Sequence, residues 1–287
     1  MPLEIAVQDV AGVRIAAAAG ADRVELCSAL QLGGLTPSLA TIEQCVGAGL
    51  PVQVLIRPRG GGFVHTPAEI DLVTADIRAA RTAGAAGVVV GGLVPASAPG
   101  GYQLDLTALA TWRRAAGAAD FVVHRCVDVL LAADPAAIDQ LGQQLANLGV
   151  TRVLTSGGAA RVGEGLAQLA ALVQAAPSVE VQAGGGARLE DFAALATAGV
   201  PSVHLSCRAT STAAGPAGPG GGPAAYDTTD PEQVAAAVAA ARAAGLGGPR
   251  RGGQPGRGEP GRAASLGGRP EHSARRTHPP ALTQSAP

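Results

Sequence analysis

Polar and charged residues stand within or directly after several short apolar runs. Glu25 lies in one such run, Arg57 directly follows another, and His124 closes a third. A carboxylate or an imidazole held beside a substrate can transfer protons, and a guanidinium group binds carboxylates and phosphates. These residue types therefore predict acid–base chemistry on a small anionic molecule.

If the apolar runs are strands, alternation places these polar residues on one face and apolar residues on the other. The side chains expected to face the interior are those of Glu4, Glu25, Cys27, Arg57, His124, Thr155, Gln182, His204 and Ser206. Burying unpaired charge costs several kcal/mol, so these groups must pair with one another, with a ligand or with water.

Two interpretations of this polar cluster stay open. In the structural one, Arg57 and Arg125 neutralise the glutamates inside the barrel. In the functional one, the cluster forms a binding site for a small polar or anionic molecule. The candidate catalytic residues are then Glu25, His124 and Asp128, and the candidate anion-binding arginines are Arg57, Arg59 and Arg125.

Glycine-rich turns follow the sixth and seventh predicted strands. The candidate anion-binding residues in this region are Thr155, Ser156, Gly157, Gly184, Gly185, Gly186 and Ser206. Such turns expose backbone N–H groups, and the loops after the last two strands of an α/β barrel often bind phosphate. The alternative is that tight strand-to-helix connections need glycine without any ligand.

Short β-branched runs alternate with alanine-rich segments, a pattern typical of a parallel sheet covered by helices. We predict strands at Leu3–Val7, Arg23–Cys27, Val52–Ile56, Gly87–Val90, Phe121–His124, Arg152–Thr155, Val179–Gln182 and Ser202–Leu205. A helix is expected after each, beginning near 9, 38, 67, 105, 134, 162, 188 and 230. Capping residues stand before prolines at Thr66, Asp134 and Asp230.

This repetition predicts an α/β protein with a (β/α)8 TIM-type barrel, favoured over an open doubly wound sheet because no GxGxxG follows the first strand. The barrel is expected over residues 1–246. Residues 247–287, rich in Gly, Arg and Pro, predict a disordered tail. Residues 210–225 predict a flexible loop able to act as a lid.

Charge and cysteine usage limit the partners and the compartment. The net charge of −1, from 21 basic and 22 acidic residues, argues against a nucleic-acid or membrane partner and favours a small molecule. We expect no signal peptide and no membrane helix, because charged residues interrupt every apolar stretch. The four cysteines form no CxxC pair, so reduced thiols in the cytoplasm are expected. A homodimer is possible for such a barrel.

Several motifs occur together and in order over residues 2–208. They are Glu25-Leu26-Cys27-Ser28, the run Leu32 to Ser38 (LGGLTPS), Ile56 to Gly61 (IRPRGG), His124-Arg125 with Asp128, Val153 to Gly157 (VLTSG) and Gly184-Gly185-Gly186. In these the chain resembles the CutC family. The resemblance implies a TIM barrel, a role in copper homeostasis, and Cu(I) binding with Cys27 as a metal ligand.

The chain departs from the family pattern at the implied copper ligands. Ala6 stands on the first strand where family members often have a cysteine, and Cu(I) prefers soft sulfur ligands. Cys126 and Cys207 can compensate for this loss or be inert, whereas Cys45 is expected to be structural.

Two functional hypotheses follow, and whether the protein is an enzyme stays open between them. The first is a copper-homeostasis protein that binds Cu(I) through Cys27 and a second soft ligand. The second is a barrel enzyme acting on a small phosphorylated or carboxylated metabolite. Its base or acid would be Glu25 or His124, and arginines with glycine turns would bind the anion.

Overall fold

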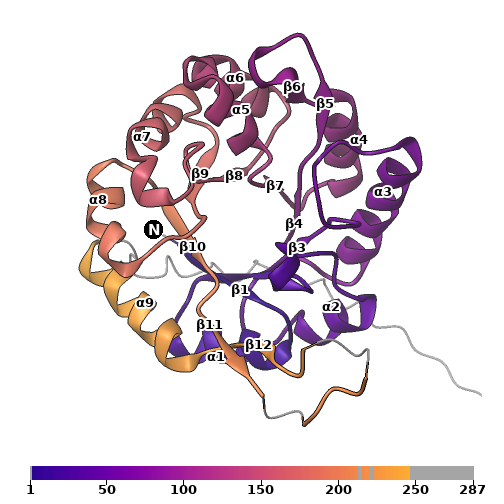
Figure 1. Cartoon of the computed structure of the whole chain (residues 1–287), viewed down its shortest axis with the longest axis vertical. Coiled ribbons are helices and arrows are strands. Elements are labelled where there is room, and N and C mark those ends of the chain that lie inside the picture. The colour runs from indigo at the N-terminus through magenta and orange to yellow at the C-terminus, as the bar shows by residue number, and fades with distance from the viewer. Residues whose placement is uncertain (1, 213–214, 220–222, 246–287) are drawn as a thin grey trace, which may run out of the picture. The chain divides into compact units, whose positions relative to one another are not determined.

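Eight parallel strands close into a barrel in the order β1-β10-β9-β8-β7-β4-β3-β2. The structure, a computed structural model, describes residues 2–212, 215–219 and 223–245, all within one compact unit, Met1–Pro249. Figure 1 shows the strands as a ring seen end-on with the helices around it. The predicted (β/α)8 barrel is confirmed. The tail predicted over 247–287 lies outside the described residues.

The barrel strands are short, and every neighbouring pair is parallel. They are β1 (Leu3–Val7), β2 (Arg23–Leu26), β3 (Val52–Leu55), β4 (Gly87–Val90), β7 (Asp120–Val123), β8 (Arg152–Thr155), β9 (Glu180–Ala183) and β10 (Ser202–Leu205). The barrel closes where β1 pairs with β10, with Glu4 opposite His204. This closing register brings two charged residues that lie 200 positions apart into one layer.

The described helices are α1 (Val10–Ala19), α2 (Leu39–Cys45), α3 (Pro67–Thr82), α4 (Leu106–Ala116), α5 (Val127–Ala133), α6 (Ile138–Asn147), α7 (Leu166–Ala175), α8 (Phe192–Thr197) and α9 (Pro231–Ala243). The caps expected at Thr66, Asp134 and Asp230 are confirmed. The Thr66 side chain accepts a hydrogen bond from Glu69 N in a capping box, and Asp230 accepts from two backbone N–H groups. No helix in the described ranges is long and apolar enough to span a membrane.

Two antiparallel hairpins extend the barrel: β5 (Leu93–Pro95) with β6 (Tyr102–Leu104), and β11 (Arg208–Ser211) with β12 (Tyr226–Thr229). The flexible loop predicted from residue 210 was therefore wrong at its start, because Thr210 and Ser211 pair with β12. The helix α5 was not predicted. It follows β7 after three residues, His124 to Cys126, with no glycine or proline to mark its start.

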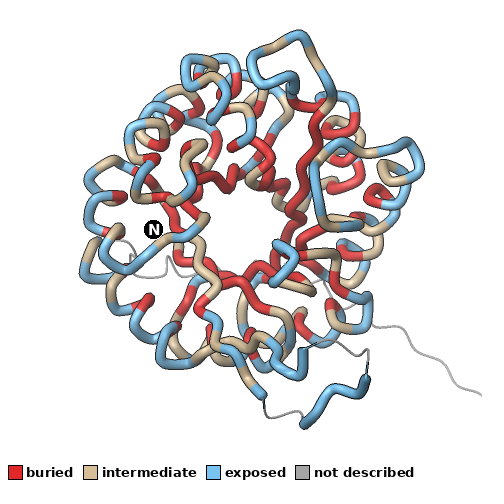
Figure 2. Tube along the Cα trace, in the orientation of Figure 1, coloured by how far each residue is buried: buried red, intermediate tan, exposed pale blue. Residues whose placement is uncertain are grey.

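The main core lies between the strands and the helices, and Figure 2 shows the strand ring as the most continuously buried part of the chain. Strand residues such as Val24, Val54 and Val181 pack outward onto the helices. A smaller apolar cluster of Cys27, Leu55, Val89 and Val122 lies apart from it. The remaining inward positions are largely polar, as the alternation predicted.

Candidate functional site

A cavity of about 490 Å³ opens at the carboxyl ends of the barrel strands. Its walls combine charged groups, apolar side chains and glycine turns, including Glu25, Arg57, Phe63, His124, Arg125 and His204. Because strand ends position these residues and loops surround them, the cavity has the usual location of a barrel active site.

Glu4 lies below the cavity in a buried ion network. Its carboxylate accepts a hydrogen bond from Arg23 Nε at 2.7 Å, and Arg152 Nη1 lies 3.6 Å away. Both arginines also contact Glu180, at 2.6 and 3.1 Å. Burial raises the pKa of Glu4, but the hydrogen bond from His204 and these arginines outweigh it and lower that pKa strongly. The structural interpretation assigned Arg57 and Arg125 to the glutamates, but the arginines that contact Glu4 are Arg23 and Arg152.

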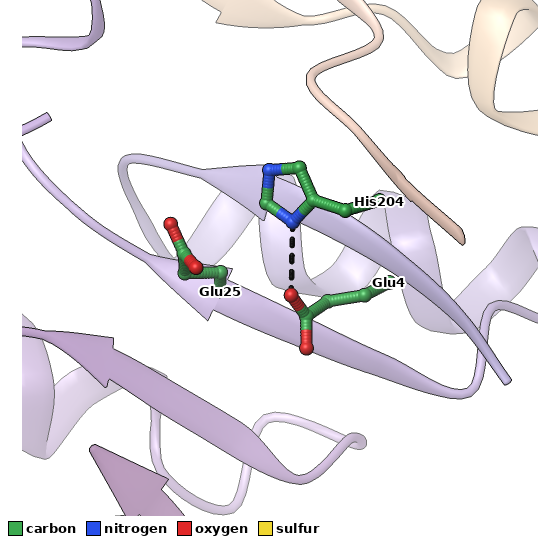
Figure 3. Close-up of side chains that lie close together, drawn as sticks. All are labelled: Glu4, Glu25 and His204. Carbon is green, nitrogen blue, oxygen red and sulfur yellow. Dashed lines mark hydrogen bonds and ion pairs between the residues drawn. The ribbon is translucent and has the colours of Figure 1, made fainter. Parts of the chain in front are cut away.

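His204 and Glu25 form the floor of the cavity. Figure 3 shows the His204 ring above Glu4, with the Glu25 carboxylate to one side. The Nδ1 atom of His204 lies 2.9 Å from Glu4 Oε1. Each of the three side chains offers a ligand atom within 4.8 Å of the others. The floor and the layer directly below it thus hold two carboxylates and one imidazole close together.

Glu25 has an incomplete set of partners. Its side chain is buried, and Oε2 has no hydrogen-bond partner among the described residues. Burial is the main cause that raises the pKa of Glu25 to about 7, with the charge of Glu4 adding to it and His204 opposing it. Burial also opposes protonation of His204, but the charges of Glu25 and Glu4 outweigh it and raise the pKa of His204. The protonation of Glu25 and that of His204 are therefore coupled.

His124 lies in the cavity wall as a neutral imidazole. Burial and the charge of Arg57 lower the pKa of His124 to about 3. Its Nδ1 accepts a hydrogen bond from Cys126 N at 3.2 Å, which leaves the ring proton on Nε2. The Phe63 ring packs at 4.9 Å from the imidazole. His124 can therefore donate a hydrogen bond to a ligand, but it is a poor proton acceptor.

Arg57 and Arg59 have different surroundings. Arg57 lines the cavity, where its guanidinium contacts the Gly33 and Gly61 carbonyls and lies 5.2 Å from the centre of the Phe63 ring. Its Nε is buried without a partner among the described residues. Arg59 pairs with Glu69 on α3 and with carbonyls of its own loop, away from the cavity walls. Of the two, Arg57 is placed to meet a ligand.

The first glycine-rich turn already holds an anion from the chain itself. The Asp128 carboxylate accepts hydrogen bonds from Thr155 Oγ1, from Ser156 N at 3.0 Å and from Gly158 N at 3.1 Å. Arg125 Nε donates to it at 2.7 Å. Thr155, Ser156, Gly157 and Asp128 are not among the cavity walls. Their interactions with one another satisfy this turn, and Leu154 rather than Thr155 faces the cavity.

The second glycine-rich turn opens to the cavity. Gly185, Gly186 and Ser206 line it, whereas Gly184 is buried against Leu154 and His204. Arg125 lies directly against this turn, because a Cβ atom on Gly185 would clash with the Arg125 guanidinium. The Asp128 carboxylate holds Arg125 in place through the hydrogen bond from Arg125 Nε. The structure therefore brings Arg125, Gly185 and Gly186 together at the cavity mouth.

Cys27 lies in an apolar setting that does not fit Cu(I) coordination. Its thiol donates weakly to the Val7 carbonyl, 3.8 Å away, and packs with Leu55 and Val89. Burial and then the charge of Glu25 raise the pKa of Cys27, whereas Cu(I) needs a thiolate. Among the described residues, the converging group of three His, Cys, Asp or Glu side chains contains oxygen and nitrogen atoms but no sulfur.

The other cysteines are also buried and protonated. Burial raises the pKa of Cys45 and Cys207 to about 11 and that of Cys126 to about 12. Cys207 lines the cavity, and its φ of +41° is unusual for a residue other than glycine. No disulfide joins any of the four.

Two groups of functional residues escaped the sequence analysis. Arg23 and Arg152 open strands β2 and β8, and Arg23 shares a face with Glu25, so alternation could have found it. Of the apolar walls, Leu154 lies on β8 and alternation from Arg152 could have found it, whereas Phe63 and Leu189 lie outside the strands, where no pattern marks them.

Comparison with known proteins gives the family of the chain. Residues 1–209 match the model of the CutC family. A CutC family protein of Agrobacterium fabrum is 42% identical over 211 residues, which is 73% of this chain and 80% of that protein. One from Pasteurella multocida is 37% identical over 72% of this chain and 82% of its own length.

A solved structure agrees with the sequence relatives. The crystal structure of the putative copper homeostasis protein CutC from Streptococcus agalactiae superposes with a TM-score of 0.64 at 29% identity. The match covers 71% of this chain and 97% of that one. With the family model and relatives above 30% identity, the chain belongs to the CutC family.

Proposed function

We propose that the cavity is the active site of an enzyme that acts on a small anionic metabolite, with Glu25 as the proton-transferring group. The observation that carries this proposal is the Glu25 carboxyl itself. It is buried at the cavity floor, has an unpartnered Oε2, and has a pKa near 7. A general acid or base works best when its pKa is near the working pH.

The neighbours of Glu25 support the same chemistry. His204, held by Glu4, lies close to Glu25, and its charge favours the ionised form of Glu25. His124 offers a neutral N–H donor from the wall, which suits a substrate oxygen that gains negative charge during proton transfer. The cavity mouth supplies the positive charge of Arg125, so an anionic group would orient the substrate there.

The test is a turnover screen of the full chain in D2O against a set of phosphorylated and carboxylated metabolites. Mass spectrometry would detect deuterium incorporation or conversion. We expect at least one metabolite to react with the wild-type protein and with Glu43→Gln, a control at an exposed glutamate of α2. The same reaction should fall at least about 100-fold in Glu25→Gln, because a positioned acid or base contributes that much. A rate unchanged in Glu25→Gln would refute the role of Glu25.

We propose a role in copper homeostasis as the second candidate, carried by the family relation and by the similarity to the copper homeostasis protein CutC of Streptococcus agalactiae. Cu(I) binding at Cys27 stays a prediction, and the buried, protonated thiol argues against it. Competition of the reduced protein with a chromogenic Cu(I) chelator tests it. Tight binding that Cys27→Ser removes would support this candidate. Weak binding indifferent to Cys27→Ser would reject Cys27 as a copper ligand.

A further inference from the structure

The two glycine-rich turns at the carboxyl end of the barrel differ in what they bind. Backbone and hydroxyl donors of the turn after β8 surround the Asp128 carboxylate. The turn after β9, at Gly185 and Gly186, lines the cavity and holds no carboxylate of the described residues. The first turn shows that this end of the barrel can bind an anion through backbone N–H groups.

The peptide between Gly185 and Gly186 is oriented by its carbonyl. Gly185 O accepts a hydrogen bond from Val162 N at 3.0 Å. In a planar trans peptide the N–H points opposite to the C=O, so Gly186 N–H points away from Val162. Neither Gly185 N–H nor Gly186 N–H has a hydrogen-bond acceptor in the described part of the chain. Their φ values of +105° and +65° are accessible to glycine at little cost.

The end of β10 adds donors beside this turn. Strands β9 and β10 are neighbours, and Ser206 and Cys207 follow β10 along the cavity wall. Their backbone N–H groups likewise find no acceptor among the residues described. Cys207 adopts a left-handed backbone conformation, which costs about 1–2 kcal/mol for a residue with a side chain. Backbone strain of this kind persists where the surrounding structure requires a special geometry.

Arg125 brings positive charge to these N–H groups. Its Nε is held by Asp128 and its Nη2 lies 2.9 Å from Ser156 Oγ, so the guanidinium is fixed in one orientation. Its Cζ and Nη1 are the atoms nearest to the place where a Cβ on Gly185 would lie. A planar carboxylate is satisfied by two donors in one plane, whereas a phosphate offers three oxygens in a tetrahedral arrangement. Donors from two strand ends and one guanidinium, all lining the same cavity, suit the tetrahedral group.

We propose that Gly185, Gly186, Ser206, Cys207 and Arg125 form the binding site for the phosphate of a phosphomonoester substrate. The inference deepens the proposed function, on which it rests. The phosphate would lie at the cavity mouth, and the rest of the substrate would extend toward Glu25 and His204 at the floor. Apolar walls at Leu154 and Leu189 leave room for a short carbon skeleton.

The test measures binding of inorganic phosphate, methyl phosphate and acetate to the full chain by calorimetry at constant ionic strength. We expect methyl phosphate and inorganic phosphate to bind at least about tenfold more tightly than acetate. Gly185→Ala should weaken phosphate binding at least about tenfold, because the added Cβ meets the Arg125 guanidinium. Gly199→Ala is the matched control, since its φ is +75° but no atom lies within 4 Å.

Arg125→Met is the second variant, and Arg114→Met on the outer helix α4 is its control. Circular dichroism of each variant confirms that it is folded before binding is measured. Arg125→Met should also lose at least about tenfold in phosphate affinity, because one charge-assisted hydrogen bond contributes that much. Phosphate binding that survives both Gly185→Ala and Arg125→Met would overturn the inference, as would acetate binding as tightly as phosphate.

The experiments distinguish a wrong phosphate site from a wrong catalytic role of Glu25. Phosphate affinity unchanged in Glu25→Gln would support a separate phosphate site at the mouth. If the wild-type protein binds no phosphate but converts a carboxylated metabolite in a Glu25-dependent manner, the phosphate site is rejected and the enzyme proposal stands. If phosphate binds as predicted but no metabolite reacts, the binding site stands and the role of Glu25 is rejected.

Discussion

Replacing Glu25 by glutamine should stabilise the protein at alkaline pH. The pKa of Glu25 rises from 4.5 to about 7 on folding, mainly through burial. The folded state then holds the proton more tightly than the unfolded state, so the free energy of unfolding falls as pH rises from about 4.5 to 7. At about 1.4 kcal/mol per pH unit, the cost of the ionised carboxylate reaches about 3 kcal/mol above pH 7.

Glutamine keeps the shape of the side chain and removes that cost. Glu25→Gln should therefore exceed the wild type in free energy of unfolding by up to about 3 kcal/mol at pH 8, and the gap should close toward pH 5. Urea denaturation followed by circular dichroism at fixed pH values between 5 and 9 measures it. The control Glu43→Gln, at an exposed position, should follow the wild type throughout. A gap that does not change with pH would refute the reasoning.

Two further perturbations test the packing of charge around the site. Arg23→Met leaves Glu4 and Glu180 with one arginine fewer. It should lower the free energy of unfolding, measured by urea denaturation, by about 3–5 kcal/mol. A loss of stability no larger than that of the exposed control Arg78→Met would contradict the buried network. Asp128→Asn places an amide among backbone donors and should cost about 3 kcal/mol through two charge-assisted hydrogen bonds. Stability equal to that of the exposed control Asp139→Asn would show that the turn does not depend on the charge.

The fold could be predicted because its signals are local and repeat along the chain. Capping residues such as Thr66 fixed helix starts, and outward valines such as Val54 and Val181 marked the helix-facing side of each strand. The helix α5 could not be predicted, because no proline or glycine marks its start. A tertiary contact stabilises this short helix instead, since the Asp128 carboxylate binds inside the turn at Ser156.

The site could be predicted only in part, because its details depend on contacts between distant residues. Alternation placed Glu25, His124 and His204 in the interior correctly. It could not show that Asp128 fills the turn at Ser156, since the two positions lie 28 residues apart. Thr155 was assigned to the interior, but alternation from Arg152 places Leu154 there instead.

The central claim is that Glu25 is a neutral-range acid at the floor of the cavity. Carbon-13 NMR of protein labelled at glutamate carboxyls, titrated from pH 4 to 9, tests it most directly. We predict one glutamate signal with a midpoint near pH 7 that is missing in Glu25→Gln. If the signal that Glu25→Gln removes instead titrates near the ordinary value of about 4.3, the carboxyl is not poised for proton transfer at neutral pH, and the account is contradicted.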